Sequence, residues 1–295
     1  MTALVPTLVL TATACTTASE EQLPVKNAAS AVGLTSGPVD RSAAALLPGS
    51  VKSKGVVTFA MDASYAPFEF FDRDNRTVVG FDVDLSTALA ARMGVRAKQV
   101  NTAFDGILPG LQARKYDAGI SGFAVTPERE KQVNFVEYLA GGTGLGIRAG
   151  NPHGLRMTPR ALCGHTIGAQ KGTVQGLEQL PDISKSCVRN GRKPVVVQLF
   201  PSQNEANLAL ASGRAEAVMA DSISTAYQAR LSGGRLRLAP GPDYERTPTG
   251  IAVPRDSRLI RALAAALKSL KADGTFDKIA KKWSIPRSAL PTSGS

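Results

Sequence analysis

The sequence predicts an α/β protein of two lobes, each a mostly parallel sheet flanked by helices. Short apolar runs typical of strands alternate with segments of helical periodicity from about residue 51 to residue 288. The alternation falls into two blocks, and the last segments look like a completion of the first block. The chain would then cross between the lobes twice, which is the connection that a hinge needs.

The first block opens with a predicted strand at residues 56–60. A predicted helix over residues 84–93 follows and stops at Gly94, because glycine favours helix C-termini. Residues 104–115 then predict a second helix, and residues 118–121 a second strand. Strands that alternate with helices in this way pair in parallel.

The second block repeats this pattern. A strand at residues 166–169 leads through a short turn into a helix over residues 174–180. Residues 195–199 predict a strand, residues 204–212 a helix and residues 217–220 another strand. This block is expected to form the second lobe.

The two crossings are expected in glycine-rich segments at residues 144–152 and 239–250. The strand at residues 250–253 and the helices from Ser257 onward then complete the first block, because roughly 40 residues cannot easily form a core of their own. The expected divisions are lobe 1 at residues 51–147 and 249–288, lobe 2 at residues 148–248, and a tail at residues 289–295.

The N-terminus is typical of an exported lipoprotein. Residues 3–14 are small or apolar, and the run Thr-Ala-Thr-Ala-Cys15 is similar to a lipoprotein cleavage box, although no Lys or Arg precedes it and Ala12 stands where leucine is usual. We therefore expect a signal peptide at residues 1–15 with Cys15 as lipid anchor, then a flexible spacer at residues 16–50 that is rich in Ala, Ser, Thr, Gly and Pro. No other segment of the sequence approaches the ~18–20 apolar residues of a membrane span.

The charge balance admits several anionic partners. Lys and Arg number 35 against 24 Asp and Glu, a net charge of +11. Nine of the 35 cations lie between Arg255 and Arg287 among regularly spaced leucines, which is the pattern of helices with one solvated face. Nucleic acid is therefore not an expected partner.

Cys163 and Cys187 are expected to form a disulfide. They remain as a pair once Cys15 is assigned to the anchor, and exported proteins mature in an oxidising compartment. Two inert buried thiols are the alternative, and a metal site is disfavoured because neither cysteine has a Cys or His at ligand spacing. The only two histidines, His153 and His165, are expected to be ordinary surface or loop residues.

Arg129 lies in the first turn of a predicted helix, where a cation is normally unfavourable. Thr126 is a good N-cap and Pro127 suits the first helical position, so Arg129 occupies the third. A cation there costs roughly 0.3–1 kcal/mol, whereas an anion would meet free backbone N–H groups. We expect Arg129 to hold an anion; the alternative is a solvated arginine paired with Glu128 or Glu130.

Three predicted strand ends together offer groups for a zwitterion, because ligands of α/β sheets bind outside the carboxyl ends of strands. Ser121 and Gly122 lead to Arg129, the turn at residues 171–173 precedes a helix, and Asp221 follows a strand. Arginine and backbone N–H groups would bind a carboxylate, and Asp221 an ammonium. The turn and Asp221 could also be only a turn with an N-cap and a helix cap.

Short motifs follow one another along the chain in a particular order. They are Ser64-Tyr-Ala-Pro-Phe-Glu-Phe70, Gly80-Phe-Asp-Val-Asp-Leu85, Phe104-Asp-Gly-Ile-Leu-Pro109, Lys115-Tyr-Asp117, the run from Ser121 to Arg129, Gly172-Thr173, Ser212-Gly-Arg214 and Ala220-Asp221. Over about residues 54–288 this order resembles the extracellular solute-binding proteins of family 3, which serve ABC importers of polar amino acids. The resemblance implies the type II periplasmic-binding-protein fold.

The resemblance also implies roles for individual residues. Arg129 would pair bidentately with the ligand α-carboxylate, helped by backbone N–H groups at Gly122, Ala124 and near Thr173 and Val174, and Asp221 would bind the α-ammonium. The expected ligand-binding residues are Asp62, Tyr65, Phe104, Ser121, Gly122, Phe123, Ala124, Arg129, Gln170, Thr173, Val174 and Asp221.

Departures from the family leave the preferred side chain open. Ala124 lacks a hydroxyl with which many relatives bind the carboxylate, and Gln170 is neutral where some carry lysine. Asp62 indicates a polar or cationic group on the ligand.

The site predicts a capture protein and no enzyme. Ligand would bridge the two lobes and stabilise a closed form that a membrane permease recognises. The expected partners are a free amino acid, the permease and ATPase of an ABC importer, and the outer face of the membrane through the lipid anchor; the chain is expected to be a monomer with no cofactor or metal. The alternatives are a dehydratase-type enzyme on the same fold, with Glu69 nominated as an acid besides Asp62 and Asp221, or a ligand-sensing module.

Overall fold

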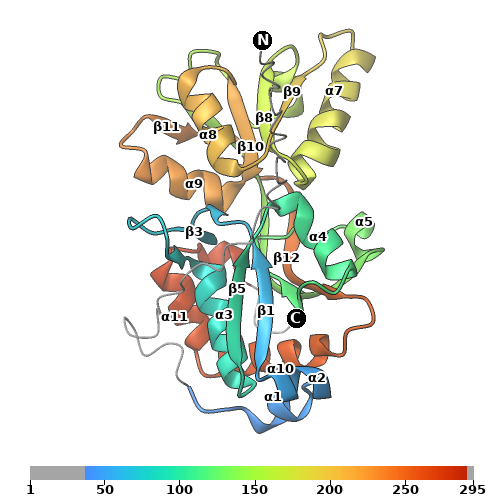
Figure 1. The fold of residues 1–295 in the computed structure, drawn as a ribbon. Coiled ribbons are helices and arrows are strands. Elements are labelled where there is room, and N and C mark those ends of the chain that lie inside the picture. The colour runs from blue at the N-terminus through green and yellow to red at the C-terminus, as the bar shows by residue number, and fades with distance from the viewer. Residues whose placement is uncertain (1–36, 291–295) are drawn as a thin grey trace, which may run out of the picture.

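The computed structural model describes residues 37–290, which form two lobes joined by two long antiparallel strands (Figure 1). Strand β7 (Val133–Arg148) pairs with β12 (Tyr244–Pro254) along most of its length and with β10 (Ala217–Asp221) at its far end. The sheets of both lobes are therefore one continuous sheet, in the order β5-β1-β6-β12-β7-β10-β8-β9, with β11 also paired to β7. The glycine-rich crossings expected from the sequence are strands at residues 144–148 and 244–250.

The first lobe, at the bottom of Figure 1, is built on parallel strands. They are β5 (Arg96–Asn101), β1 (Val56–Met61) and β6 (Ala118–Gly119). Its helices are α3 (Phe81–Arg92), α4 (Phe104–Gln112), α5 (Pro127–Glu130), α10 (Leu259–Ala272) and α11 (Thr275–Lys282). Phe59, Leu89 and Leu263 lie fully buried in the core between sheet and helices. The predicted strands and helices of this block are thus present, with ends shifted by a few residues.

A small second sheet projects from the first lobe toward the second, and the sequence analysis did not predict it. It consists of β2 (Ser64–Tyr65), β3 (Glu69–Phe71) and β4 (Val78–Val79). Tyr65 and Phe68 stack with their ring centroids 5.8 Å apart. This packing accounts for the aromatic residues among positions 65–71.

The second lobe, at the top of Figure 1, carries the parallel strands β8 (Thr166–Gln170), β9 (Val196–Phe200) and β10. Its other elements are α6 (Pro159–Leu162), η2 (Gln175–Gln179), α7 (Leu180–Arg189), α8 (Gln203–Ser212), α9 (Ser222–Leu231) and β11 (Leu236–Leu238). The helix expected over residues 174–180 is the π-helical turn η2, which continues directly into α7.

The expected spacer and tail are wrong where the structure describes them. Asp40 caps α1 (Arg41–Ala45) through hydrogen bonds of 2.8 and 3.0 Å to backbone N–H groups, and Ala43 is fully buried. Helix α2 (Gly49–Lys54) follows, and η3 (Arg287–Ala289) buries Ala289 against the first core. Val51 is buried in the same core, and Leu46 and Leu47 pack against it, which the Ala- and Ser-rich composition of the segment did not indicate. The signal peptide, Cys15 and the remainder of both segments lie outside the described residues.

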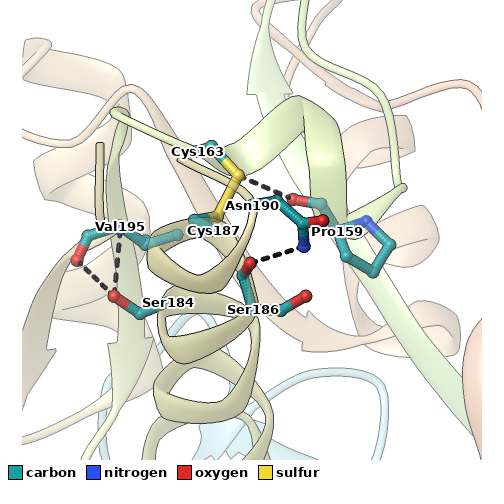
Figure 2. Close-up of a disulfide and its surroundings, with 7 residues drawn as sticks. All are labelled: Pro159, Cys163, Ser184, Ser186, Cys187, Asn190 and Val195. Carbon is teal, nitrogen blue, oxygen red and sulfur yellow. Dashed lines mark hydrogen bonds between the residues drawn. A yellow bond between two sulfur atoms is a disulfide. The ribbon is translucent and has the colours of Figure 1, made fainter. Parts of the chain in front are cut away.

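A disulfide joins Cys163, just after α6, to Cys187 in α7 (Figure 2). The two Cα atoms are 5.6 Å apart, and the bond closes 24 positions of sequence. The expected pairing is confirmed. Within residues 37–290, the helices are all too short or too polar to cross a bilayer.

Candidate functional site

A cavity lies between the lobes, beside the strands that join them. Ten of the twelve expected ligand-binding residues line it: Tyr65, Phe104, Ser121, Gly122, Ala124, Arg129, Gln170, Thr173, Val174 and Asp221. Eight further residues line it that the sequence analysis missed: Gly141, Gly142, Thr143, Gln175, Gln179, Glu245, Thr247 and Thr249. Asp62 and Phe123 lie behind the cavity wall.

Arg129 points across the cavity from α5, as the cap and proline predict. Thr126 caps α5 by accepting from the Arg129 N–H, and the guanidinium donates to Ala124 O at 2.8 Å and to Gly172 O of the other lobe at 3.1 Å. Burial lowers the pKa of Arg129 to about 10, so it remains charged at neutral pH. No carboxylate within residues 37–290 forms an ion pair with it, which leaves a buried cation available to an anion.

Some backbone N–H groups of the cavity residues already have hydrogen-bond partners within residues 37–290, and others do not. Residues on either side of Ala124 bond to β12, at 2.8 Å from Val125 N to Pro248 O and 2.9 Å from Gly250 N to Phe123 O, and that pairing does not use the Ala124 N–H. Helix η2 begins at Gln175, after Val174. Gly176 N donates to Thr173 Oγ1 at 3.3 Å and Leu177 N to Thr173 O at 3.0 Å, and this capping does not use the N–H of Val174. Ala124 and Val174 both line the cavity together with Arg129.

Gly122 does not contribute its N–H, contrary to expectation. Its φ of +56° turns the N–H toward Asp82, whose Oδ2 accepts at 3.0 Å. A Cβ at this position would also lie 3.3 Å from the Tyr65 ring. Gly122 therefore shapes the wall of the cavity, and its N–H is bonded to Asp82.

Asp221 faces the cavity from the end of β10. Its Oδ1 accepts from Ile223 N at 2.8 Å and from Ser224 N at 3.3 Å, so it does cap α9. Its Oδ2 points toward Gly141, where a Cβ would lie only 2.8 Å away. Burial raises the pKa of Asp221 to about 6. One oxygen thus serves the helix, and the other remains for a cation.

Aromatic rings form the wall on the first-lobe side. Phe104 stacks on Phe123 with centroids 4.7 Å apart, and Arg129 lies over both rings at 5.6 and 5.5 Å. Phe123 is fully buried behind Phe104, so it supports the wall and does not face the cavity. Tyr65 closes the opposite side and accepts from Asp221 N at 2.9 Å.

Asp62 is sealed from the cavity by Gln170. Its Oδ2 accepts from Gln170 Nε2 at 2.8 Å and from Phe104 N at 3.0 Å, and burial raises its pKa. A neutral glutamine that spans the lobes thus takes the place that a ligand group would need to reach Asp62. The expectation that Asp62 lines the cavity is wrong for this arrangement.

A polar network between η2 and the joining strands β7 and β12 contains four of the eight missed residues. Thr143 on β7 donates to Gln179 Oε1 at 2.7 Å and accepts from Gln175 Nε2 at 2.9 Å. Gln179 Nε2 in turn donates to Glu245 Oε2 on β12 at 3.0 Å. Glu245 has a positive φ of 45° at an irregularity in the β7–β12 register. No local sequence motif marks such a residue, because the strand irregularity places it.

The nominated acid Glu69 does not reach the cavity. It is fully buried below Ser121, whose hydroxyl donates to Glu69 Oε1 at 2.6 Å, and it lies beside the buried carboxyl of Asp82. Burial and the neighbouring carboxyl raise the pKa of Glu69 well above its ordinary value. This pair supports the floor of the site and has no access to a reacting molecule there.

The lobes touch each other directly around the cavity. Hydrogen bonds between them join Tyr65 to Asp221, Ala66 to Ser224, Asp62 to Gln170, Ser64 to Gln203 and Arg129 to Gly172, and an ion pair of 2.8 Å joins Asp105 to Lys171. The structure therefore shows a closed arrangement, in which Arg129 of one lobe and Asp221 of the other face one cavity.

Comparisons with known proteins agree with this architecture. The sequence profile of the bacterial extracellular solute-binding proteins, family 3, matches residues 57–286. The arginine-binding protein ArgT of Corynebacterium glutamicum is 32% identical over 83% of this chain and 80% of its own length, and the ABC transporter arginine-binding protein 1 of Escherichia coli is 32% identical over 77% and 90%. A solved ancestral arginine-binding protein bound to arginine superimposes with a TM-score of 0.70 at 33% identity, covering 78% of this chain and 98% of that one.

Proposed function

This chain belongs to family 3 of the bacterial extracellular solute-binding proteins, and we propose on that premise that it captures a cationic amino acid, arginine foremost, for an ABC importer. Relatives at about one-third identity are named as arginine-binding proteins. Their names describe binding and no catalysis, and the acid nominated for an enzyme, Glu69, lies outside the cavity of this chain.

The choice of a cationic amino acid as ligand rests on the charged residues that line the cavity. Arg129 supplies a cation, and Asp221 and Glu245 supply two carboxylates. An amino acid with a cationic side chain brings the complementary set: one carboxylate, one ammonium and one further cation. A neutral amino acid would leave Glu245 without a charged partner on the ligand.

Each ligand group has a counterpart in this proposal. The α-carboxylate would meet Arg129 bidentately, together with the N–H groups of Ala124 and Val174. The α-ammonium would meet Asp221 Oδ2, and the aliphatic part of the side chain would lie between Tyr65 and Phe104.

Closure links binding to transport. The proposed lobes are residues 51–147 with 249–288 and residues 148–248, and β7 and β12 connect them. A ligand that contacts both lobes binds the closed form more tightly and so increases its population, which the permease of an ABC importer would recognise. We place the protein outside the cytoplasm, with acylated Cys15 as the proposed attachment to the membrane.

Isothermal titration calorimetry of the mature protein with L-arginine tests this function. The wild type should bind one arginine per chain, and Arg129→Ala should lose measurable binding because nothing else supplies the bidentate contact. Lys131→Ala is the matched control: this exposed cation lies two residues further along, pairs with Glu128 and does not line the cavity. Wild-type affinity in Arg129→Ala, or a stronger response to neutral than to cationic amino acids in a thermal-shift screen, would contradict the proposal.

A further inference from the structure

The only two histidines of the chain meet at one carboxylate. His153 Nδ1 lies 3.1 Å from Glu216 Oε1, and His165 Nδ1 lies 3.0 Å from Glu216 Oε2. The centroids of the two imidazole rings are 6.1 Å apart. Three possible ligand atoms, one from each residue, lie within 4.8 Å of one another. The sequence analysis expected two unrelated surface residues, because 51 positions separate His165 from Glu216.

The fold brings these residues together at the end of the second lobe opposite the cavity. Glu216 directly precedes β10 and His165 directly precedes β8, and these strands are parallel neighbours with Ala217 beside Ile167. The cavity residues Gln170 and Asp221 lie at the other ends of the same two strands. The cluster therefore shares no residue with the cavity.

Hydrogen bonds fix the side chain of Glu216 and the backbone segments that carry the two histidines. Thr166 N donates to Glu216 Oε2 at 2.8 Å, and Val196 N bonds to His165 O at 2.9 Å. His153 lies in a tight turn closed by Asn151, whose Oδ1 accepts from Leu155 N at 2.9 Å. The side chains are about 30% exposed, which leaves room for water beside them.

We propose that His153, His165 and Glu216 form a binding site for a divalent first-row transition-metal ion such as Zn²⁺. Two imidazoles and a carboxylate are a donor set that such ions prefer. Tetrahedral bonds of about 2.0–2.1 Å separate ligand atoms by about 3.3 Å, close to the N–O distances in this cluster. Solvent water completes the coordination, and the bound ion links the turn after β7 to the N-terminal ends of β8 and β10.

Arg148 competes with the ion in the metal-free arrangement. Its Nη2 lies 3.3 Å from His153 Nε2, so that nitrogen accepts and Nδ1 carries the proton that faces Glu216. Binding of a metal at Nδ1 moves the proton to Nε2 and displaces Arg148. Removal of this guanidinium should therefore strengthen metal binding.

Titration of the mature, tag-free protein with ZnCl₂ in calorimetry tests the site. The wild type should bind one Zn²⁺ per chain, reversibly with EDTA and equally well with or without L-arginine. His153→Gln, His165→Gln and Glu216→Gln should each weaken binding at least tenfold, and Arg148→Gln should tighten it. Glu205→Gln, a change of an exposed carboxylate on α8 of the same lobe, should have no effect.

Circular dichroism and thermal unfolding without metal establish that each variant is folded. The proposal fails if the wild type shows no saturable one-to-one binding with a Kd below about 100 μM, which corresponds to a binding free energy of about −5.5 kcal/mol. It also fails if the three cluster variants bind Zn²⁺ as tightly as the wild type. Weaker binding in Arg148→Gln would also contradict it, because the guanidinium would then support the ion.

Discussion

At the scale of single residues, Asp221 divides its carboxylate between α9 and the cavity, and burial raises its pKa to about 6. A raised pKa means that the folded protein binds this proton more tightly than the unfolded chain does. The stabilisation from the protonated carboxyl is complete below the ordinary pKa of 3.8 and is lost as the pH rises through about 6. The ammonium of a ligand favours the opposite, ionised form.

Arginine affinity should therefore fall about tenfold when the pH is lowered from 7 to 5, because the ionised fraction of Asp221 falls by that factor. Calorimetry at several pH values measures this change directly. Asp221→Asn should bind weakly and show little dependence on pH over this range. Equal wild-type affinity at pH 5 and pH 7 would show that Asp221 does not pair with the ammonium.

Glu245 should decide between cationic and neutral ligands. Glu245→Gln should weaken arginine binding roughly twofold to fivefold and leave glutamine binding unchanged, because an exposed ion pair contributes up to about 1 kcal/mol. Asp243→Asn is the matched control, since Asp243 pairs with Arg246 and does not line the cavity. An equal loss for both amino acids would indicate a structural effect on β12 and no charge recognition.

At the scale of elements, the Cys163–Cys187 disulfide ties the end of α6 to α7 (Figure 2), and neither cysteine lines the cavity. Replacement of both cysteines by serine should lower the free energy of unfolding by roughly 3 kcal/mol, because the unfolded chain regains the freedom that the closed loop removes. Urea unfolding measures the loss. Arginine affinity should stay unchanged; a loss below 0.5 kcal/mol (about the cost of a neutral surface change) would assign the disulfide no stabilising role.

Element types were predicted well wherever a local pattern carried them. Thr126 and Pro127 mark the start of α5, apolar spacing marks α3, and short apolar runs mark β1, β6, β8, β9 and β10. The 16-residue strand β7 was missed, because its glycines resemble a loop in sequence. Its pairing with β10 and β12 on both sides supplies the hydrogen bonds that local propensity does not indicate.

At the scale of the whole molecule, hydrogen bonds between the lobes should set the balance between open and closed forms. Ser224 of the second lobe donates to Ala66 O of the first at 2.7 Å, and both residues are buried. Ser224 does not line the ligand cavity, so its substitution tests closure without a change in the ligand contacts.

Ser224→Ala should weaken arginine binding roughly twofold to tenfold, because one hydrogen bond of about 0.5–1.5 kcal/mol is lost only in the closed form. Calorimetry gives the affinity, and small-angle scattering shows whether the ligand-free protein becomes more open. Ser232→Ala removes a hydroxyl that bonds within the second lobe and should leave the affinity unchanged. Unchanged affinity in Ser224→Ala would argue against a closing role for this contact.

The sequence alone determined the α/β class and the helix start that carries Arg129, because helix caps, periodicity and the ends of strands are local properties. Most of the cavity lining was expected from the resemblance of its motifs to the family. Only the tertiary structure decided that Gln170 seals Asp62, that Gly122 gives its N–H to Asp82, and that Glu245 enters the cavity. The meeting of His153, His165 and Glu216 is of the same kind. These contacts join residues far apart in the chain, so they depend on strand register and on the way the two lobes close together.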